Sequence, residues 1–323
     1  MRDEQKRVLV TGALGQIGSE LTPMLRDRHG RENVIAVDYR SPAEAGSAEL
    51  GPFELVDVTD RDRVGEVVSS YNINTVYHMA AILSARGEAD PRRAWDVNVE
   101  GLINVLDVAA TRHARVFVPS SIAVFGPETP REAAPQEVAL LPTTMYGVTK
   151  VSGELLGEYY VRRFGLDVRG LRYPGIISSE TPPGGGTTDY AVEMFYAAIE
   201  TTHYTCYVRP DTTLPMMYMP DCIKATLDLM AADPASLRTH ATSYNVAGMS
   251  FSAEELAEEI RRHIPDFRCD YAPDDRQKIA DSWPCAIDDS AARNEWAWAP
   301  AYDLESMTAD MLKRLRARLV PTE

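Results

Sequence analysis

Short β-rich runs alternate with helical stretches over about the first 175 residues, and this alternation limits the folds open to the chain. The runs rich in β-branched and aromatic residues are 7–11, 33–38, 54–57, 75–78, 115–120 and 167–171. The stretches with apolar residues at helical spacing include 16–28, 60–71, 91–111 and 146–164. Steady alternation implies right-handed crossovers and a parallel sheet covered by helices on both faces. The sequence therefore predicts an α/β fold with a doubly wound parallel sheet.

The alternation stops at a loop rich in Pro and Gly, residues 178–188. The elements expected beyond it are helices at 188–200, after Pro220 and at 304–319, and a short strand at 243–246. Another helix should begin at Ser252, because Glu255 three residues later fits a capping box. We therefore expect a first domain, residues 1–175, and a smaller C-terminal α/β substrate lobe, residues 176–323, with the chain crossing back to the first domain.

The charge of the chain argues against several classes of partner. The 323 residues include 48 acidic and 33 basic side chains, and the formal net charge of −15 repels nucleic acids and anionic membranes. No apolar run approaches the roughly 18 residues of a membrane span, and the first residues resemble neither a signal nor a transit peptide. The four cysteines are scattered, without histidines at ligand spacing. We therefore expect a cytoplasmic protein with no disulfide framework and no metal, which binds neither nucleic acid nor membrane.

Three glycines, Gly12, Gly15 and Gly18, form a Gly-x-x-Gly-x-x-Gly turn between the first predicted strand and helix. This spacing allows a tight turn and close approach of the backbone to a pyrophosphate at the helix N-terminus, although glycines also mark ordinary turns. Asp38 ends the second strand, 20 residues after Gly18. A carboxylate there accepts hydrogen bonds from ribose hydroxyls and repels a 2′-phosphate. The pattern favours NAD over NADP on a Rossmann sheet.

Two features near this turn admit a second interpretation. Arg40 could accommodate a 2′-phosphate, but we favour a solvated surface charge. Asp57 and Val58 end the third predicted strand, where a side chain can meet the adenine amine. Asp57 could equally cap a turn. The sequence leaves these alternatives open.

Tyr146 and Lys150 lie four residues apart at the start of a predicted helix, so their side chains share one face. A nearby ammonium lowers the pKa of a tyrosine towards the range of a base. With 15 Tyr and five Lys, chance supplies such a pair in about one chain in four. The pair gains weight because it follows the fifth strand, which ends near Ser121. A hydroxyl there faces the ligand crevice and can orient a reacting oxygen, although Ser121 could merely cap the strand.

These motifs together resemble the extended short-chain dehydrogenase/reductase family over nearly the whole chain. The residues that carry the resemblance are the glycine turn, His78-Met79-Ala80-Ala81, Asn98, Ser121 and the Tyr146/Lys150 pair. The resemblance implies that Ser121 orients a substrate hydroxyl, Tyr146 is the base, and Lys150 lowers its pKa and binds ribose. The other positions implied to line the NAD site are Gln16, Ile17, Ala80, Ala81, Asn98, Tyr173 and Ile176. Asn98 would brace the site through its helix, or would satisfy buried groups at a strand end.

Two departures separate the chain from the sugar-nucleotide epimerases of that family. Those enzymes typically carry Arg-Tyr-Phe-Asn after the sixth strand, where this chain has Arg172-Tyr173-Pro174-Gly175 and lacks the amide. The stretch in which they clamp a diphosphate with arginine is here the apolar run 214–221. Segments 184–193, 204–207 and 214–221 instead resemble the short-chain L-threonine 3-dehydrogenases.

That resemblance implies NAD-dependent, zinc-independent oxidation of the L-threonine 3-hydroxyl to L-2-amino-3-oxobutyrate, with hydride passing from C3 to the nicotinamide. The expected substrate contacts are Ser84, Ser121, Tyr146, Gly186 and Thr187. The backbone N–H groups of the 184–187 loop suit the substrate carboxylate. Ser84 or Thr187 could instead cap a helix, and the glycines could serve a mobile lid.

Two rival functions remain. The first is a nucleotide-sugar epimerase or dehydratase, and the second is a non-catalytic sensor that binds NAD. Sensors of this kind often lack the tyrosine or the lysine, and this chain has both. The family resemblance further implies a homodimer, paired through the long helices near Asp96 and Glu154.

Overall fold

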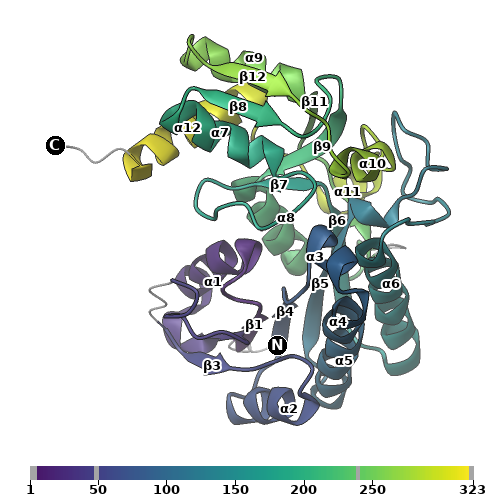
Figure 1. Cartoon of the computed structure of the whole chain (residues 1–323). Helices are drawn as coiled ribbons and strands as arrows, with labels where there is room; N and C mark the ends of the chain where they lie inside the picture. Colours follow the sequence, from purple (N-terminus) through teal and green to yellow (C-terminus); the bar gives the residue numbers. More distant parts are fainter. Residues whose placement is uncertain (1–5, 47–50, 238–240, 320–323) are drawn as a thin grey trace.

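The computed structural model describes residues 6–46, 51–237 and 241–319. Its main sheet has seven parallel strands in the order β10-β6-β5-β4-β1-β2-β3. These strands are β1 (Val8–Thr11), β2 (Val34–Asp38), β3 (Phe53–Leu55), β4 (Thr75–His78), β5 (Arg115–Ser121), β6 (Val168–Tyr173) and β10 (Tyr244–Asn245). The order reverses between β1 and β4, so the predicted doubly wound Rossmann sheet is confirmed (Figure 1).

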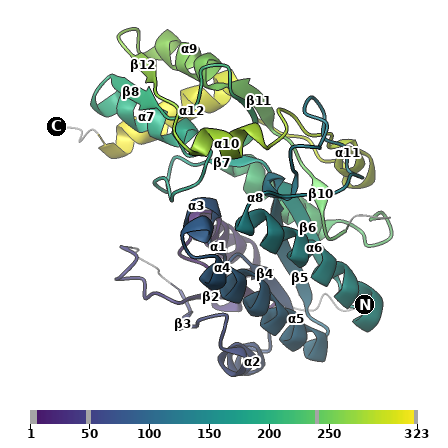
Figure 2. The same cartoon turned by 45° about the vertical axis from the view of Figure 1, so that its right-hand side comes forward.

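Helices cover both faces of this sheet. Those on one face are α1 (Gln16–His29) and α8 (Met219–Ala231), and those on the other are α2 (Arg61–Ser70), α5 (Gly101–Arg112) and α6 (Met145–Phe164) (Figure 2). In β1, Val8 and Val10 pack on the face covered by α1 and α8, and Leu9 packs on the face covered by α2, α5 and α6. Successive side chains of a strand point to opposite faces, so a strand between two helical layers buries side chains on both of its faces.

Side chains just outside the helices account for where several of them begin. Asp60 precedes α2 and accepts a hydrogen bond from the backbone N of Arg63 at 3.0 Å. Thr144 precedes α6 and accepts one from the N of Gly147 at 3.1 Å. The predicted capping box of Ser252 and Glu255 is confirmed at the start of α9 (Ala253–His263).

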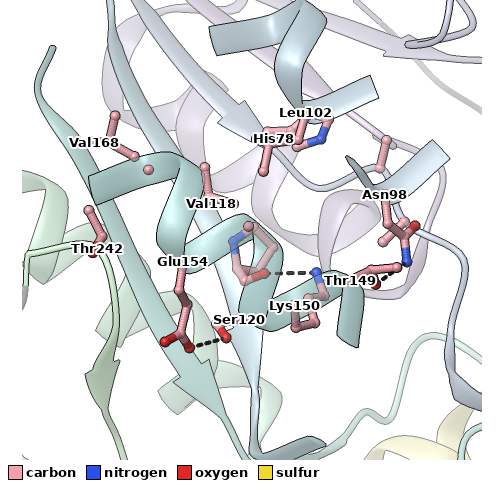
Figure 3. A pocket seen from close by; sticks show the side chains of 15 residues that line it. His78, Asn98, Leu102, Val118, Ser120, Thr149, Lys150, Glu154, Val168 and Thr242 are labelled. Carbon is pink, nitrogen blue, oxygen red and sulfur yellow. Dashed lines mark hydrogen bonds between the residues drawn. The ribbon is translucent and has the colours of Figure 1, made fainter. Parts of the chain in front are cut away.

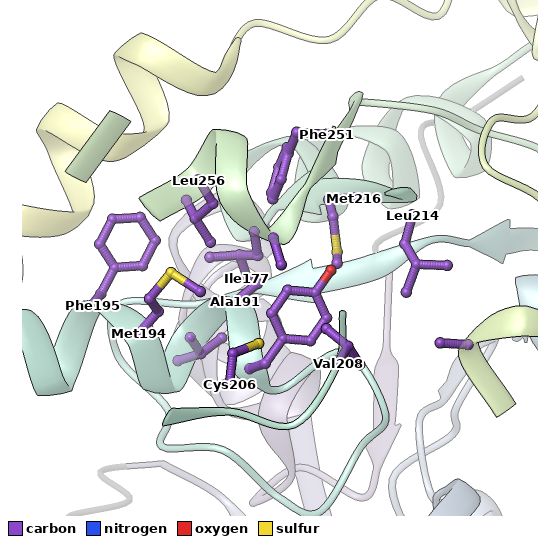
Figure 4. Packing of buried hydrophobic residues seen from close by; sticks show 14 of the residues in the cluster. Ile177, Ala191, Met194, Phe195, Cys206, Val208, Leu214, Met216, Phe251 and Leu256 are labelled. Carbon is purple, nitrogen blue, oxygen red and sulfur yellow. The ribbon is translucent and has the colours of Figure 1, made fainter. Parts of the chain in front are cut away.

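The second part of the chain gathers at the carboxyl end of the main sheet (Figure 1). Its strands are β7 (Gly175–Ile177), β9 (Thr213–Tyr218) and β11 (Met249–Ser252) in one sheet, and β8 (His203–Cys206) and β12 (Arg268–Tyr271) in another. Its longer helices are α7 (Tyr190–Glu200), α9 and α12 (Leu304–Leu319). Buried side chains such as Phe195, Met216 and Leu256 form the core between these elements (Figure 4). The last helix lies where the sequence predicts it, and β10 returns from this part to pair with β6.

The structure corrects several predicted boundaries. The helical stretch 91–111 is three segments, α4 (Pro91–Trp95), the π-helical turn η2 (Asp96–Glu100) and α5, and the third strand ends at Leu55. The helix expected from 188 begins at Tyr190. The short elements that the sequence does not predict include α3 (Ser84–Ala89), α10 (Arg276–Asp281), α11 (Ser290–Trp296), and the 3-10 turns η1 (Arg31–Asn33) and η3 (Ile122–Val124). Among the described residues no helix is long and apolar enough to cross a membrane.

Candidate active site

The glycine turn lies where the order of the strands reverses. Gly12 has a φ of +62°, and a Cβ at this position would lie 2.7 Å from the backbone N of Ala80, just after β4. A Cβ at Gly18 would lie 2.2 Å from the carbonyl oxygen of Gly12. Both positions therefore require glycine. Gly15 is the N-cap of α1, and neither a capping side chain nor an acidic residue occupies the first turn. The first N–H groups of α1 are left to an anion such as a pyrophosphate.

Asp38 lies beside this turn at the end of β2 and is 4% exposed. One carboxylate oxygen accepts a hydrogen bond from the N of Leu14 and the other from the N of Arg40, both at 3.1 Å. The Nε of Arg40 is 3.6 Å from the same carboxylate. Arg40 is therefore a surface charge, with its side chain 40% exposed, that also pairs with Asp38. The carboxylate lies at the rim of the turn, a position that fits a ribose.

Asp57 and Val58 have structural roles beyond the end of β3. Asp57 accepts hydrogen bonds from the backbone N and the hydroxyl of Thr59 at 3.0 and 2.8 Å, and one from Arg93 at 3.0 Å. Burial raises the pKa of Asp57, but these bonds outweigh burial and the pKa is lowered. Val58 is buried, and its carbonyl accepts a bond from Asn104 at 3.0 Å. Asp57 therefore caps the turn that follows β3, which is the second of the two roles considered for it.

The end of β5 brings Ser121, Tyr146 and Lys150 together. The Nζ of Lys150 donates to the carbonyl of Pro119 at 2.8 Å and lies 5.5 Å from the centre of the Tyr146 ring. Tyr146 is hydrogen-bonded to Ser121. The hydroxyl of Ser121 also accepts a bond from the N of Ala123 at 3.2 Å, where it caps η3. Ser121 thus both caps the strand end and contacts Tyr146.

The pKa values of this pair differ from the sequence-based expectation. Burial raises the pKa of Tyr146 to about 12, opposed in part by the hydrogen bond to Ser121. Burial lowers the pKa of Lys150 to about 8, opposed by the charge of Glu154. We expected a nearby ammonium to lower the pKa of Tyr146, but in the chain by itself this pKa is raised, because loss of hydration is the largest effect.

A cavity of about 140 Å³ lies in front of Tyr146, among α1, the ends of β4, β5 and β6, and the loop before α7. The predicted site residues that line it are Gln16, Ile17, Ala81, Ser84, Ser121, Tyr146, Lys150, Tyr173, Ile176, Gly186 and Thr187. The predicted residues outside its lining are Gly12, Gly15, Gly18, Asp38, Asp57, Val58, Ala80 and Asn98. The lining residues that the sequence did not predict include Asp189 and Trp283. Nothing near Trp283 in the sequence indicates that the loop after α10 reaches this cavity.

The loop before α7 is held by Asp189. One oxygen of its buried carboxylate accepts hydrogen bonds from the N–H groups of Gly185 and Gly186, both at 2.8 Å. The expectation that these N–H groups receive a substrate carboxylate is therefore wrong. Thr187 has a buried hydroxyl without a hydrogen bond to any described residue, and Asp189, not Thr187, is the N-cap of α7. Ser84 is likewise inside α3 and not its N-cap. The hydroxyl of Thr187 is left for a ligand, and Ser84 lines the same cavity.

Asn98 links the loop after β4 to α6 from the π-helical turn η2. Its side-chain oxygen accepts a bond from the N of Ile82 at 2.7 Å. Its amide donates to the carbonyl of Ile82 and to the hydroxyl of Thr149, both at 3.0 Å. Asn98 therefore satisfies buried backbone groups just beyond the end of β4, which is one of the two roles expected for it. Its bond to Thr149 also braces α6. Over the described ranges, no group of His, Cys, Asp and Glu side chains is arranged to hold a metal ion.

Comparisons with known proteins agree with this geometry. Residues 8–247 match the model of the NAD dependent epimerase/dehydratase family. An L-threonine dehydrogenase from Clostridium difficile is 48% identical with a TM-score of 0.95, over 98% of this chain and 99% of its own. A monomeric L-threonine 3-dehydrogenase from a metagenome is 50% identical with a TM-score of 0.93, over 97% of this chain and 99% of its own.

An uncharacterized epimerase/dehydratase from Staphylococcus aureus is 48% identical over 314 residues, which cover 97% of this chain and 98% of that protein. The family match covers the glycine turn, Asp38, Ser121 and the Tyr146/Lys150 pair. The chain belongs to the NAD dependent epimerase/dehydratase family of extended short-chain dehydrogenases/reductases.

Proposed function

We propose that this protein oxidises the 3-hydroxyl group of L-threonine with NAD, and so forms L-2-amino-3-oxobutyrate, NADH and a proton. The observation that carries this proposal is the wall of the cavity in front of Tyr146. Lys150 is the only cationic side chain among the described residues that line it, whereas Asp189 supplies a negative charge. A nucleotide-sugar diphosphate needs cationic partners. A small amino acid with an ammonium group suits this lining better, and the similarity to L-threonine dehydrogenases supports the same substrate.

The polar groups of the cavity match the groups of threonine. The carboxylate of Asp189 attracts the substrate ammonium, for which the sequence suggests no partner. The hydroxyls of Thr187 and Ser84 donate hydrogen bonds to the substrate carboxylate. Trp283 closes the wall and excludes water from the reacting carbon.

Two observations support NAD as the cofactor. The uncapped N-terminus of α1 suits the pyrophosphate, and Asp38 at the rim of the glycine turn suits ribose hydroxyls. When bound, NAD supplies the hydride acceptor for C3 and a second positive charge near Tyr146. Tyr146 takes the proton of the 3-hydroxyl, while Ser121 hydrogen-bonds the same oxygen. Lys150, held on the carbonyl of Pro119, stabilises the phenolate.

The test is the absorbance of NADH with L-threonine, L-serine, D-threonine, L-allo-threonine or UDP-galactose, each supplied separately with NAD. We expect NADH with L-threonine, and far less when NADP replaces NAD. The UDP-galactose sample is also followed by NMR, because an epimerase converts it to UDP-glucose without net NADH. Such conversion, or no NADH from L-threonine, would contradict the proposal. Tight NAD binding without any turnover would support the non-catalytic sensor instead.

A further inference from the structure

Three residues of α6, one helical turn apart, contact three consecutive residues at the end of β5. The contacts are Tyr146 with Ser121, the Nζ of Lys150 with the carbonyl of Pro119 at 2.8 Å, and a carboxylate oxygen of Glu154 with the hydroxyl of Ser120 at 2.5 Å. Residues four apart on a helix share one face. Glu154 therefore extends the stripe that carries the proposed base and its lysine.

Glu154 is buried and rigidly held. Arg172 on β6 donates to both oxygens of its carboxylate, at 2.8 and 2.7 Å. Arg172 also donates to the carbonyl of Gln136 at 3.0 Å and to the side chain of Asn245 at 3.2 Å. The side chain of Glu154 therefore points into the fold. The two hydrogen bonds from Arg172 hold this carboxylate in one orientation.

Lys150 and Glu154 line the same small cavity. A small cavity of about 20 Å³, room for roughly one water, lies between α6 and the ends of β4 and β5 (Figure 3). Its titratable lining residues, within the described chain, are Lys150, Glu154 and His78. Burial lowers the pKa of His78 to about 3, so this ring is neutral. Tyr146 faces Lys150 from α6, and Arg172 lies behind Glu154. Glu154 is the one acidic side chain in this lining.

We propose that Glu154 is a positioning residue that keeps the ammonium group of Lys150 charged behind Tyr146. Burial alone favours the neutral amine, and a fixed carboxylate one helical turn away favours the charged form. The charge of Lys150 in turn lowers the cost of forming the Tyr146 phenolate. This inference rests on the proposed roles of Tyr146 and Lys150, and it extends the site to Ser120, Glu154 and Arg172.

The test is the pKa of Lys150, measured by NMR on protein labelled with ¹³C at the lysine Cε. The chain has only five lysines, and the signal lost in Lys150→Arg identifies the relevant one. Glu154→Gln keeps the shape and the hydrogen bond to Ser120 but removes the charge. We expect the pKa of Lys150 to fall by about one pH unit. We also expect the alkaline limb of kcat/KM for L-threonine to move to lower pH by the same amount.

The matched control is Glu158→Gln, the same change one turn further along α6, where the glutamate pairs with Arg162 at 2.8 Å. It should leave the pKa of Lys150 unchanged. If Glu154→Gln does not fold, the double variant Glu154→Gln/Arg172→Gln replaces the ion pair by amides, and the pKa should still fall, by less. An unchanged pKa in the folded variant overturns the inference, whatever the activity. If the pKa falls but the wild type forms no NADH from L-threonine, the positioning role stands and the proposed function fails.

Discussion

Tyr146 has to lose a proton in surroundings that resist ionisation. Burial raises its pKa to about 12, so the side chain is neutral at pH 7. Positive charge must offset this cost when the base acts, and Lys150 is the charge that the chain itself provides. Burial also lowers the pKa of Lys150 to about 8, so its ammonium group loses its proton more readily than that of an exposed lysine. The pair is therefore sensitive to each further charge placed beside it.

Replacing Tyr146 by phenylalanine removes the base and keeps the ring. Proton transfer by a positioned base contributes about 100- to 10,000-fold, so we expect kcat/KM for L-threonine to fall by at least about 100-fold. NAD binding, measured by titration of protein fluorescence, should largely survive. The control is Tyr159→Phe, at an exposed tyrosine on the same helix, which should retain normal activity. Near-normal turnover in Tyr146→Phe would remove this residue from the role of base.

Asp189 is the residue to which we assign the substrate ammonium. In Asp189→Asn the side-chain oxygen can still accept the bonds from Gly185 and Gly186, so the loop keeps its shape. The lost charge should raise the KM for L-threonine about tenfold or more, and leave the KM for NAD unchanged. Steady-state kinetics with each substrate varied in turn measure both constants. An unaltered KM for L-threonine would place the ammonium elsewhere.

At the scale of elements, the start of α6 depends on close packing against η3. A Cβ at Gly147 would lie 2.2 Å from the carbonyl oxygen of Ala123, whereas at Gly65 on α2 the nearest atom would be 3.8 Å away. Gly147→Ala should cost about 1–3 kcal/mol of stability and displace the turn that carries Tyr146. Gly65→Ala should gain about 1 kcal/mol. Thermal unfolding followed by circular dichroism measures both. A Gly147→Ala protein with wild-type stability and activity would contradict this packing.

The main sheet could be predicted because its inner strands are short runs rich in β-branched and aromatic residues, and because capping side chains mark the starts of α2 and α6. The strands of the second part could not, for local reasons. β8 and β12 are partly exposed, β7 has three residues, and β9 includes Pro215, so none shows a clean alternation. The π-helical turn around Asn98 could not be predicted either, because the hydrogen bond of that side chain to Ile82 joins it to a loop distant in sequence.

Part of the candidate site could be predicted from the sequence, and part could not. Ser121, Tyr146 and Lys150 could be predicted because one strand end and one helix start bring them together. Asp189 and Trp283 meet them only through the packing of the second part onto the first. The contact of Glu154 with Arg172 likewise joins α6 to β6 in three dimensions. Spacing along the chain carries no information on such contacts.

At the scale of the whole molecule, we propose that two copies pair through the outer face of α6. Val148, Leu155 and Tyr159 lie on one stripe of this helix and are 39%, 66% and 54% exposed. Exposed apolar stripes mark interaction surfaces. Sedimentation velocity at micromolar concentration should give a species of twice 35.8 kDa. Leu155→Arg should give monomers, and Met24→Arg, at an exposed methionine on α1, should remain dimeric. A wild-type protein that sediments as a monomer would contradict the pairing.

The central claim concerns the molecule as a catalyst: hydride leaves C3 of L-threonine for the nicotinamide. L-threonine deuterated at C3 tests it directly, with the reduced cofactor examined by proton NMR. We predict that each reduced nicotinamide carries one deuterium at C4, and that the deuterated substrate reacts no faster than ordinary L-threonine. Reduced cofactor without deuterium would contradict the account, and so would no reduced cofactor at all.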